Sequence, residues 1–413
     1  MKKVILYAVA ASLICCNFSC NKEDNPNDVK PFKPIELTIK QAQKADADNR
    51  FSFKMFREVS ALSEKPNTFF SPLSLNMALG MLYNGASGDT RTEMAEVMGM
   101  ADFTDTEINE YYQKMSQALL NIDPKTDISI ANSIWYRTIL PVKQPFIDVN
   151  QKYFDAMVKA LDFSKSDAAD IINKWCADKT KNRIKEIIEK PIPGNVMMYL
   201  INALYFKSKW QSQFDKKQTK QDDFTKAGNQ KIKVNMMEQT TTLPYYADQH
   251  LQCVEMLYGN QAFSMVAILP VNDMDIDRLI EYLDNEVWQK IINNLFQHEV
   301  HLKLPRFKIE CDIPLNDPVK NVGMQLIFDR NLADFTNISD VFLFVSDIKQ
   351  KTFVEVNEEG TEAAAVTVIQ MDKTSAGPGT IVQFFANRPF LYLIKEKSTG
   401  AILFIGRMDE PKE

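Results

Sequence analysis

The chain has 413 residues, 45% of them hydrophobic and 25% charged, an ordinary composition for a folded globular protein. The net charge of −6 argues against nucleic acid as the partner, because a nucleic-acid-binding face is basic. After residue 20 the sequence contains no apolar stretch of the roughly 20 residues that a membrane-spanning helix needs.

The first 20 residues have the pattern of a secretory signal peptide. Lys2 and Lys3 precede an apolar run over residues 4–14, and small residues and cysteines follow. Cys20 ends this segment, and a polar tether over residues 21–38 comes next, which resembles a bacterial lipoprotein. We therefore expect a lipid on Cys20 that anchors the chain to the membrane, at the cell surface of a bacterial outer membrane. The alternatives are lipidation at Cys16 and simple export to the periplasm.

The first half of the chain after the tether is predicted to be mainly helical. A helix is expected over residues 39–62, with Phe51, Met55 and Phe56 on one face. The remaining elements predicted in this half are a short strand and two helices over 67–100, an amphipathic helix over 105–122, a strand over 127–137, and helices over 148–161 and 168–188.

The second half is predicted to consist mainly of strands. The apolar run over residues 195–210 has strand character, and strands predominate from about residue 232 onward. One helix over 275–295 and another near 316–322 interrupt them. Because helices are concentrated in the first half of the sequence and strands in the second, we predict an α+β fold rather than a repeat of βαβ units.

The sequence contains no recognisable set of catalytic or metal-ligating residues. Cys176, Cys253 and Cys311 are isolated and odd in number, so we expect buried, unpaired thiols rather than disulfides or a zinc site. His298 and His301 are three residues apart in a predicted strand, which places them on opposite faces. We expect no cofactor, no metal and no enzyme activity.

Five segments in order identify a family resemblance: NTFFSPLSLNMALGMLYNGA, LINALYFKSKWQSQF, KLPRFKIE, FVEVNEEGTEAAAVT and NRPFLYLIKEKSTGAILFIGRM. Together they resemble the serpin family from about residue 45 to 411. The resemblance implies a single serpin domain over 39–413, with three β-sheets, eight or nine helices and an exposed reactive-centre loop at about 358–385. The signal peptide makes the chain similar to the bacterial surface-anchored serpins.

The resemblance also implies a monomeric suicide-substrate inhibitor that forms a covalent complex with serine proteases, including trypsin-like ones, or with cysteine proteases. The alternative is a non-inhibitory serpin acting as a surface binding protein. Small residues in the hinge favour inhibition. The hinge residues are Glu358, Glu359, Gly360, Thr361, Glu362, Ala363, Ala364 and Ala365.

Alternation in the loop supports insertion into a sheet as a strand. One face contains no charge, and it is formed by Thr361, Ala363, Ala365, Thr367, Ile369 and Met371. Gly360 gives the hinge its backbone freedom, and Glu358 and Glu359 are expected to keep the entry point solvated. An acid at one of the uncharged positions would be buried without a partner, at a cost of several kcal/mol.

The reactive bond is placed by counting from Gly360 as in family members. This gives the bond between Thr374 and Ser375, whereas a loop shorter by one residue gives the bond after Lys373. Lys373 would suit a trypsin-like protease, and Met371 is a secondary candidate.

Two supporting clusters follow from the resemblance. Ser71, Ser74, Asn202 and Gln350 occupy the positions of a buried hydrogen-bonded cluster where the sheet opens. Gln350 replaces the usual histidine, which removes a titratable proton. At the top of the sheet, Glu358 is expected to face Arg306 in a bidentate pair, with Trp210 nearby.

Overall fold

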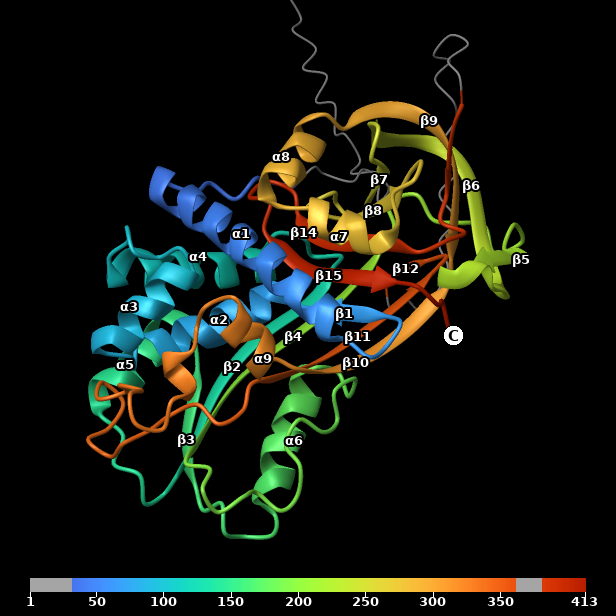
Figure 1. Cartoon of the computed structure of the whole chain (residues 1–413). Coiled ribbons are helices and arrows are strands. Elements are labelled where there is room, and N and C mark those ends of the chain that lie inside the picture. The colour runs from blue at the N-terminus through green and yellow to red at the C-terminus, as the bar shows by residue number, and fades with distance from the viewer. Residues whose placement is uncertain (1–31, 362–380) are drawn as a thin grey trace, which may run out of the picture. The chain divides into compact units, whose positions relative to one another are not determined.

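The structure, a computed structural model, describes residues 32–361 and 381–413 of the chain, within one compact unit, Pro31–Glu413. Most helices come from the first half of the sequence and most strands from the second, as the colours in Figure 1 show. This agrees with the predicted α+β fold. The helices of the described residues are α1 (Ile39–Leu62), α2 (Pro72–Tyr83), α3 (Gly88–Val97), α4 (Asp105–Asn121), α5 (Gln144–Phe154), α6 (Ala168–Lys179), α7 (Ile276–Tyr282), α8 (Asn285–Asn293) and α9 (Asn316–Asn321).

The strands form two hydrogen-bonded networks. They are β1 (Thr68–Phe70), β2 (Asp127–Arg137), β3 (Met157–Leu161), β4 (Met198–Lys209), β5 (Lys220–Thr225), β6 (Lys231–Ala247), β7 (Leu251–Leu257), β8 (Phe263–Pro270), β9 (Phe296–Pro305), β10 (Phe307–Pro314), β11 (Lys349–Asn357), β12 (Gly360–Thr361), β13 (Val382–Phe385), β14 (Phe390–Glu396) and β15 (Ile402–Met408). Six strands pair in the order β10-β11-β12-β4-β2-β3, and the other nine belong to the second network.

The long strand β6 explains why the described strands form two networks rather than the three sheets that the resemblance implies. Residues 231–236 of β6 pair with β5, and residues 245–247 pair with β7. Between them, β6 pairs with β9 over residues 236–245. Two sheets are therefore joined through β6 and β9 into one continuous path of hydrogen bonds.

Helix α1 has the predicted bounds, and its sequence explains where it begins. The Thr38 hydroxyl accepts a hydrogen bond from the Gln41 N–H, and the Gln41 side chain accepts one from the Thr38 N–H. This capping box satisfies two N–H groups that a helix start would otherwise leave unpaired. Phe51, Met55 and Phe56 are buried, so the predicted apolar face packs into the core.

Strand β4 separates two layers of apolar packing. Ile201 and Ala203 belong to a cluster that includes residues of α6, whereas Leu204 and Phe206 belong to the main core. This alternation is the two-residue period of a strand that is covered on both faces. Figure 1 shows α6 lying against the ribbons of β2 and β4.

The predicted helix over 148–161 was wrong in its second half. Helix α5 ends at Phe154, because Asp155 adopts a left-handed conformation with φ 49°. Residues 157–161 then form β3, which pairs parallel with β2. The helix predicted over 168–188 likewise ends at Lys179.

The helix predicted over 275–295 is two helices. The Asp284 side chain accepts a hydrogen bond from the Val287 N–H and caps α8, so a new helix begins where the first has ended. Strand β5 was missed by the sequence analysis.

The folded unit begins earlier than residue 39. The Ile35 N–H donates to the Ser398 hydroxyl at 2.9 Å, and Phe32, Ile35 and Leu37 pack against the main core. The last part of the predicted tether is therefore attached to the domain.

The three cysteines outside the signal segment are buried and free, as predicted. Within residues 32–361 and 381–413, no helix is long and apolar enough to cross a membrane.

Candidate functional site

The predicted hinge enters the six-stranded sheet at β12. Gly360 pairs with Lys209 of β4 and Asn357 of β11, and Thr361 pairs with Ser208 and Val356. Both pairings are antiparallel. The first residues of the loop thus already form a short strand between β4 and β11.

The rest of the predicted loop lies outside the described residues. This concerns Glu362, Ala363, Ala364, Ala365, Met371, Lys373, Thr374 and Ser375, as well as the lipidation candidate Cys20.

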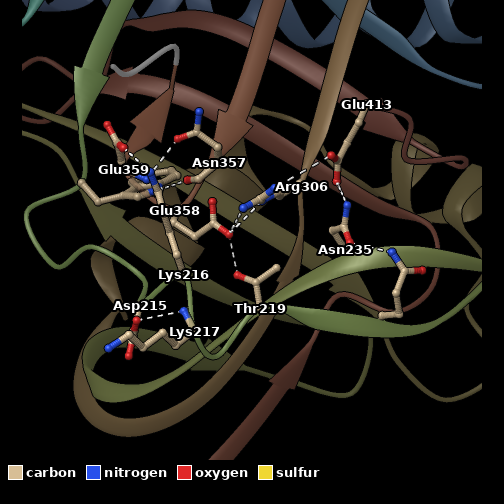
Figure 2. A network of polar contacts seen from close by, with 12 residues as sticks. Asp215, Lys216, Lys217, Thr219, Asn235, Arg306, Asn357, Glu358, Glu359 and Glu413 are labelled. Carbon is tan, nitrogen blue, oxygen red and sulfur yellow. Dashed lines mark hydrogen bonds and ion pairs between the residues drawn. The ribbon is translucent and has the colours of Figure 1, made fainter. Parts of the chain in front are cut away.

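The predicted contact between Glu358 and Arg306 is present, with a different geometry (Figure 2). Two guanidinium nitrogens of Arg306 donate to the same carboxylate oxygen, Oε1, with the Nε contact at 2.8 Å, so the pair is not bidentate. The Thr219 hydroxyl also donates to this oxygen. Burial alone would raise the pKa of Glu358, but the hydrogen bonds from Arg306 and Thr219 outweigh it and hold the pKa below its ordinary value.

The prediction that the two hinge glutamates keep the entry point solvated was wrong. Glu358 is 1% exposed and Glu359 is 6% exposed. The Lys216 ammonium lies 2.6 Å from Glu359 Oε1 (Figure 2), and the backbone N–H of Trp210 donates to the Glu359 backbone carbonyl. Each carboxylate therefore has its own cation: Lys216, from the segment between β4 and β5, pairs with Glu359, and Arg306, from between β9 and β10, pairs with Glu358.

Trp210 connects the hinge to the core. Its indole N–H donates to the Asn357 carbonyl at 2.9 Å, and its ring stacks on Tyr258 at 4.3 Å between centroids. The Tyr258 hydroxyl lies 2.6 Å from the Thr361 hydroxyl. Burial raises the pKa of Tyr258 far above its ordinary value, so this side chain stays neutral. Sequence reasoning missed Tyr258, Thr219 and Lys216, because no motif in a single sequence marks them.

Gln350 and Ser71, two of the predicted sheet-opening residues, are directly hydrogen-bonded. The Gln350 side chain accepts from the Ser71 N–H at 2.7 Å and donates to the Ser71 carbonyl at 2.9 Å. The Ser71 hydroxyl donates to the Leu403 carbonyl and also caps α2 at Ser74. Gln350 thus fixes the start of α2 against β11 without any titratable group.

Asn202 and Ser74 complete this cluster from β4 and α2. The Ser74 hydroxyl lies 3.4 Å from the Asn202 carbonyl, and the Asn202 side chain donates to Asn132 of β2 at 2.7 Å. Asn132 was not predicted. The cluster therefore links α2 with three strands of the six-stranded sheet.

A cavity of about 550 Å³ lies next to this cluster. Its walls include residues 198–203 of β4, residues 342–351 before and within β11, and one face of α2. Ser74, Asn202 and Gln350 line it. The cavity therefore lies between β4 and β11. Strand β12 lies between the same two strands, nearer to their C-terminal ends.

His298 and His301 are ordinary strand residues. His298 is exposed on β9, and His301 lies 2.7 Å from Glu238 on the neighbouring strand. In the part of the chain that the structure describes, no three His, Cys, Asp or Glu side chains are grouped as a metal site would require.

Comparison with known proteins agrees with this geometry. A protein-family model described as "Serpin (serine protease inhibitor)" matches residues 46–411. Iripin-1 of Ixodes ricinus is 32% identical over 395 residues, which cover 92% of this chain and 100% of Iripin-1.

Solved structures are similar over nearly the same length. The thermophilic serpin tengpin in its native state matches with a TM-score of 0.82 at 30% identity, over 92% of this chain and 97% of tengpin. Thyroxine-binding globulin in complex with thyroxine matches with a TM-score of 0.80 at 26% identity, over 90% of this chain and 100% of that protein. The sequence motifs, the sheet topology and these matches together show that the chain belongs to the serpin family.

Proposed function

We propose that this chain is an irreversible suicide-substrate inhibitor of serine proteases, which traps the acyl-enzyme by inserting its own loop between β4 and β11. Serpins are in general protease inhibitors rather than enzymes, although thyroxine-binding globulin is a non-inhibitory member. The observation that carries the proposal is β12, where the hinge already pairs with both neighbouring strands.

The register of β12 supports insertion of a loop segment of defined length. In the antiparallel register of β12, Thr361 pairs with Ser208, so each later loop residue would pair with the preceding residue of β4. Residue 371, ten positions after Thr361, would therefore pair with Met198 at the start of β4. Residues 366–371 would then lie along residues 198–203, which line the cavity. A strand of ten further residues extends by about 34 Å.

The same register supports the predicted cleavage site. Lys373 and Thr374 follow residue 371 by two and three positions, so cleavage after either residue frees a strand that fills the length of β4. Thr361 is 2% exposed and faces the core. Alternate residues of an inserted strand would therefore face the core too, and these are the uncharged ones of the loop.

The chemistry begins as ordinary proteolysis. The protease serine attacks the carbonyl carbon of the reactive bond, an ester forms, and the amine of the next residue leaves with a proton. The freed strand then inserts and moves the ester-linked protease away from the loop's original position. A cysteine protease would form a thioester in the same way.

Insertion must be favourable for the trap to work. Each inserted residue adds hydrogen bonds to β4 and β11, and alternate side chains become buried. The intact chain is therefore metastable and is held by a kinetic barrier until the loop is cut.

A gel experiment with trypsin tests the proposal. We expect a band that survives denaturant and has the summed mass of trypsin and the cut chain, with a released fragment that begins at Thr374; a protease that prefers small residues should instead release a fragment that begins at Ser375. A Lys373→Ala variant should lose the trypsin complex and keep a complex with a protease that prefers small or apolar residues. Cleavage without any covalent band would instead favour the non-inhibitory alternative, and cleavage before Ile369 or after Gly377 would contradict the loop register.

We also propose that a lipid on Cys20 anchors a monomeric inhibitor to the outer surface of a bacterial outer membrane. Support comes from the signal-like segment before Cys20 and the polar residues after it. A Cys20→Ala variant should fail to incorporate a fatty-acid label and should leave the membrane fraction. Unchanged labelling of this variant, together with a lost label in Cys16→Ala, would move the anchor to Cys16.

A further inference from the structure

One of the contacts between the hinge and the core is a pair of buried hydroxyl groups. Thr361 is 2% exposed and Tyr258 is 0% exposed, and their oxygens lie 2.6 Å apart. Such a short distance is typical of a good hydrogen bond between hydroxyls. Because both groups are out of reach of bulk water, separating them would leave two buried polar atoms without this bond.

The ring of Tyr258 is held rigidly in place. Trp210 stacks on it at 4.3 Å with an interplanar angle of 12°, and Phe206 meets it edge-on at 5.4 Å. Tyr258 also forms a backbone bridge with Trp210. The hydroxyl therefore has a fixed position in the core, and residue 361 reaches it only when the hinge lies within the sheet.

We propose that Tyr258 is a positioning residue for loop insertion, whose hydroxyl holds Thr361 between β4 and β11 in the intact chain and thereby starts insertion in the correct register. This inference rests on the proposed inhibitory function and names the contact that begins its conformational step. A one-residue slip would place Glu362 against the Tyr258 hydroxyl and would turn the charged face of the loop toward the core.

The kinetic consequence follows from competition between two steps. After cleavage, the ester is either hydrolysed by the protease or carried away as the loop inserts. A hinge that is already paired has its first inter-strand contacts in place, so insertion proceeds without the entropy loss of finding them. A hinge without this bond inserts later, and more cut molecules are released for each protease that is trapped.

The principal experiment measures how many inhibitor molecules are consumed per trypsin molecule trapped. Tyr258→Phe and Thr361→Val should each raise this number by about tenfold, which corresponds to about 1.4 kcal/mol. Thr361→Ser keeps the hydroxyl and should stay within about twofold of the parent chain. The double variant Tyr258→Phe/Thr361→Val should resemble each single variant rather than their product, because both partners of one bond are then absent.

Tyr392→Phe is the matched control. Tyr392 is also 0% exposed, and its hydroxyl has no hydrogen-bond partner among the described residues. Removing this hydroxyl should leave the number of inhibitor molecules consumed per trapped trypsin unchanged, although the chemical change is the same as in Tyr258→Phe. Equal effects of the two Tyr→Phe changes would overturn the proposal, because general core destabilisation would then account for both.

A second measurement needs no protease. Hydrogen exchange of the Gly360 and Thr361 amides in the intact chain should be about tenfold faster in Tyr258→Phe than in the parent chain or in Tyr392→Phe. Unchanged exchange would overturn the proposed role of Tyr258, even where trypsin complexes form normally. If the parent chain forms no protease complex at all, the inhibitory function fails, and exchange still decides whether Tyr258 holds the hinge.

Discussion

Gly360 lies so close to β4 that a Cβ atom at this position would be 2.1 Å from the Ser208 carbonyl oxygen. It would also be 2.7 Å from the Lys209 Cα, so only backbone movement could relieve the overlap. The close approach of the hinge to β4 therefore requires glycine at position 360.

Gly360→Ala should displace the hinge from the sheet. We expect a loss of about 5- to 150-fold in the ratio of trapped trypsin to cleaved chain, since overpacking against a rigid backbone costs about 1–3 kcal/mol. Gly194→Ala is the matched control, because a Cβ there would meet no atom within 4 Å. A normal trapping ratio in Gly360→Ala would show that insertion does not begin at β12.

Glu358→Lys should open the top of the sheet. The substitution places an ammonium group in a site where Glu358 is 1% exposed, beside the half-buried Arg306 guanidinium, so two like charges repel each other there. We expect loss of monomer at moderately raised temperature to be about tenfold faster, as seen by size-exclusion chromatography. Glu64→Lys makes the same charge change at an exposed position and serves as the control. An unchanged monomer fraction in Glu358→Lys would contradict this role of the Arg306 pair.

Acid should loosen the hinge through the same carboxylate. The pKa of Glu358 lies below the value of about 4.3 that an unfolded glutamate has, so its ion pair stabilises the fold fully above that pH. This contribution is lost as the pH falls through the lowered pKa of the folded state. Between pH 8 and 5 the rate of monomer loss should stay constant, because Gln350, unlike a histidine at this position, does not titrate. Below about pH 4 the rate should rise.

Glu358→Gln isolates this effect from the other carboxyl groups. The variant lacks the titrating group and should lose monomer faster at neutral pH, with a smaller further rise in acid. A rise of the same size in the variant and the parent chain would assign the acid sensitivity to other residues.

The buried ion pair of Lys44 and Asp48 should matter for stability far more than a surface pair. Lys44 is 1% exposed and also lies 3.1 Å from the Tyr112 hydroxyl, while burial raises the pKa of Asp48 even though Lys44 opposes this shift. Lys44→Met leaves a buried carboxylate without its cation and should lower the unfolding free energy by about 3–5 kcal/mol in urea. The double change Lys44→Met/Asp48→Leu should recover most of this loss.

Lys174→Met provides the comparison, because the Lys174–Asp178 pair has the same spacing but is exposed. Its removal should change the urea midpoint little. Equal effects at the two sites would mean that burial of the Lys44 pair has no energetic consequence.

Local patterns predicted helices α1 and α4 well, but they gave wrong ends for other helices and missed short elements. The bounds of α1 were correct, since its capping box and the apolar face that includes Phe51, Met55 and Phe56 lie within one stretch of 24 residues. Strand β3 has only five residues and depends on pairing with β2, which comes from elsewhere in the chain. A five-residue segment cannot be assigned from its own pattern when the partner strand decides its conformation.

The site was predictable only where a motif marked it. Glu358, Arg306 and Trp210 lie in segments that resemble the family, and the structure brings them together at the hinge. The burial of Glu359 was not predictable, because its cation, Lys216, comes from a segment 143 residues earlier. Tyr258 could not be found either, since its role depends on stacking with Trp210 and on the register of β12.

The most direct test of the stored-energy account compares thermal unfolding of the intact chain with that of the chain cut once within residues 371–375. If cleavage releases a strand that fills the space between β4 and β11, the cut chain should unfold at a clearly higher temperature than the intact one. If the cut chain unfolds at the same or a lower temperature, no energy is stored in the intact fold, and the proposed trapping mechanism is wrong.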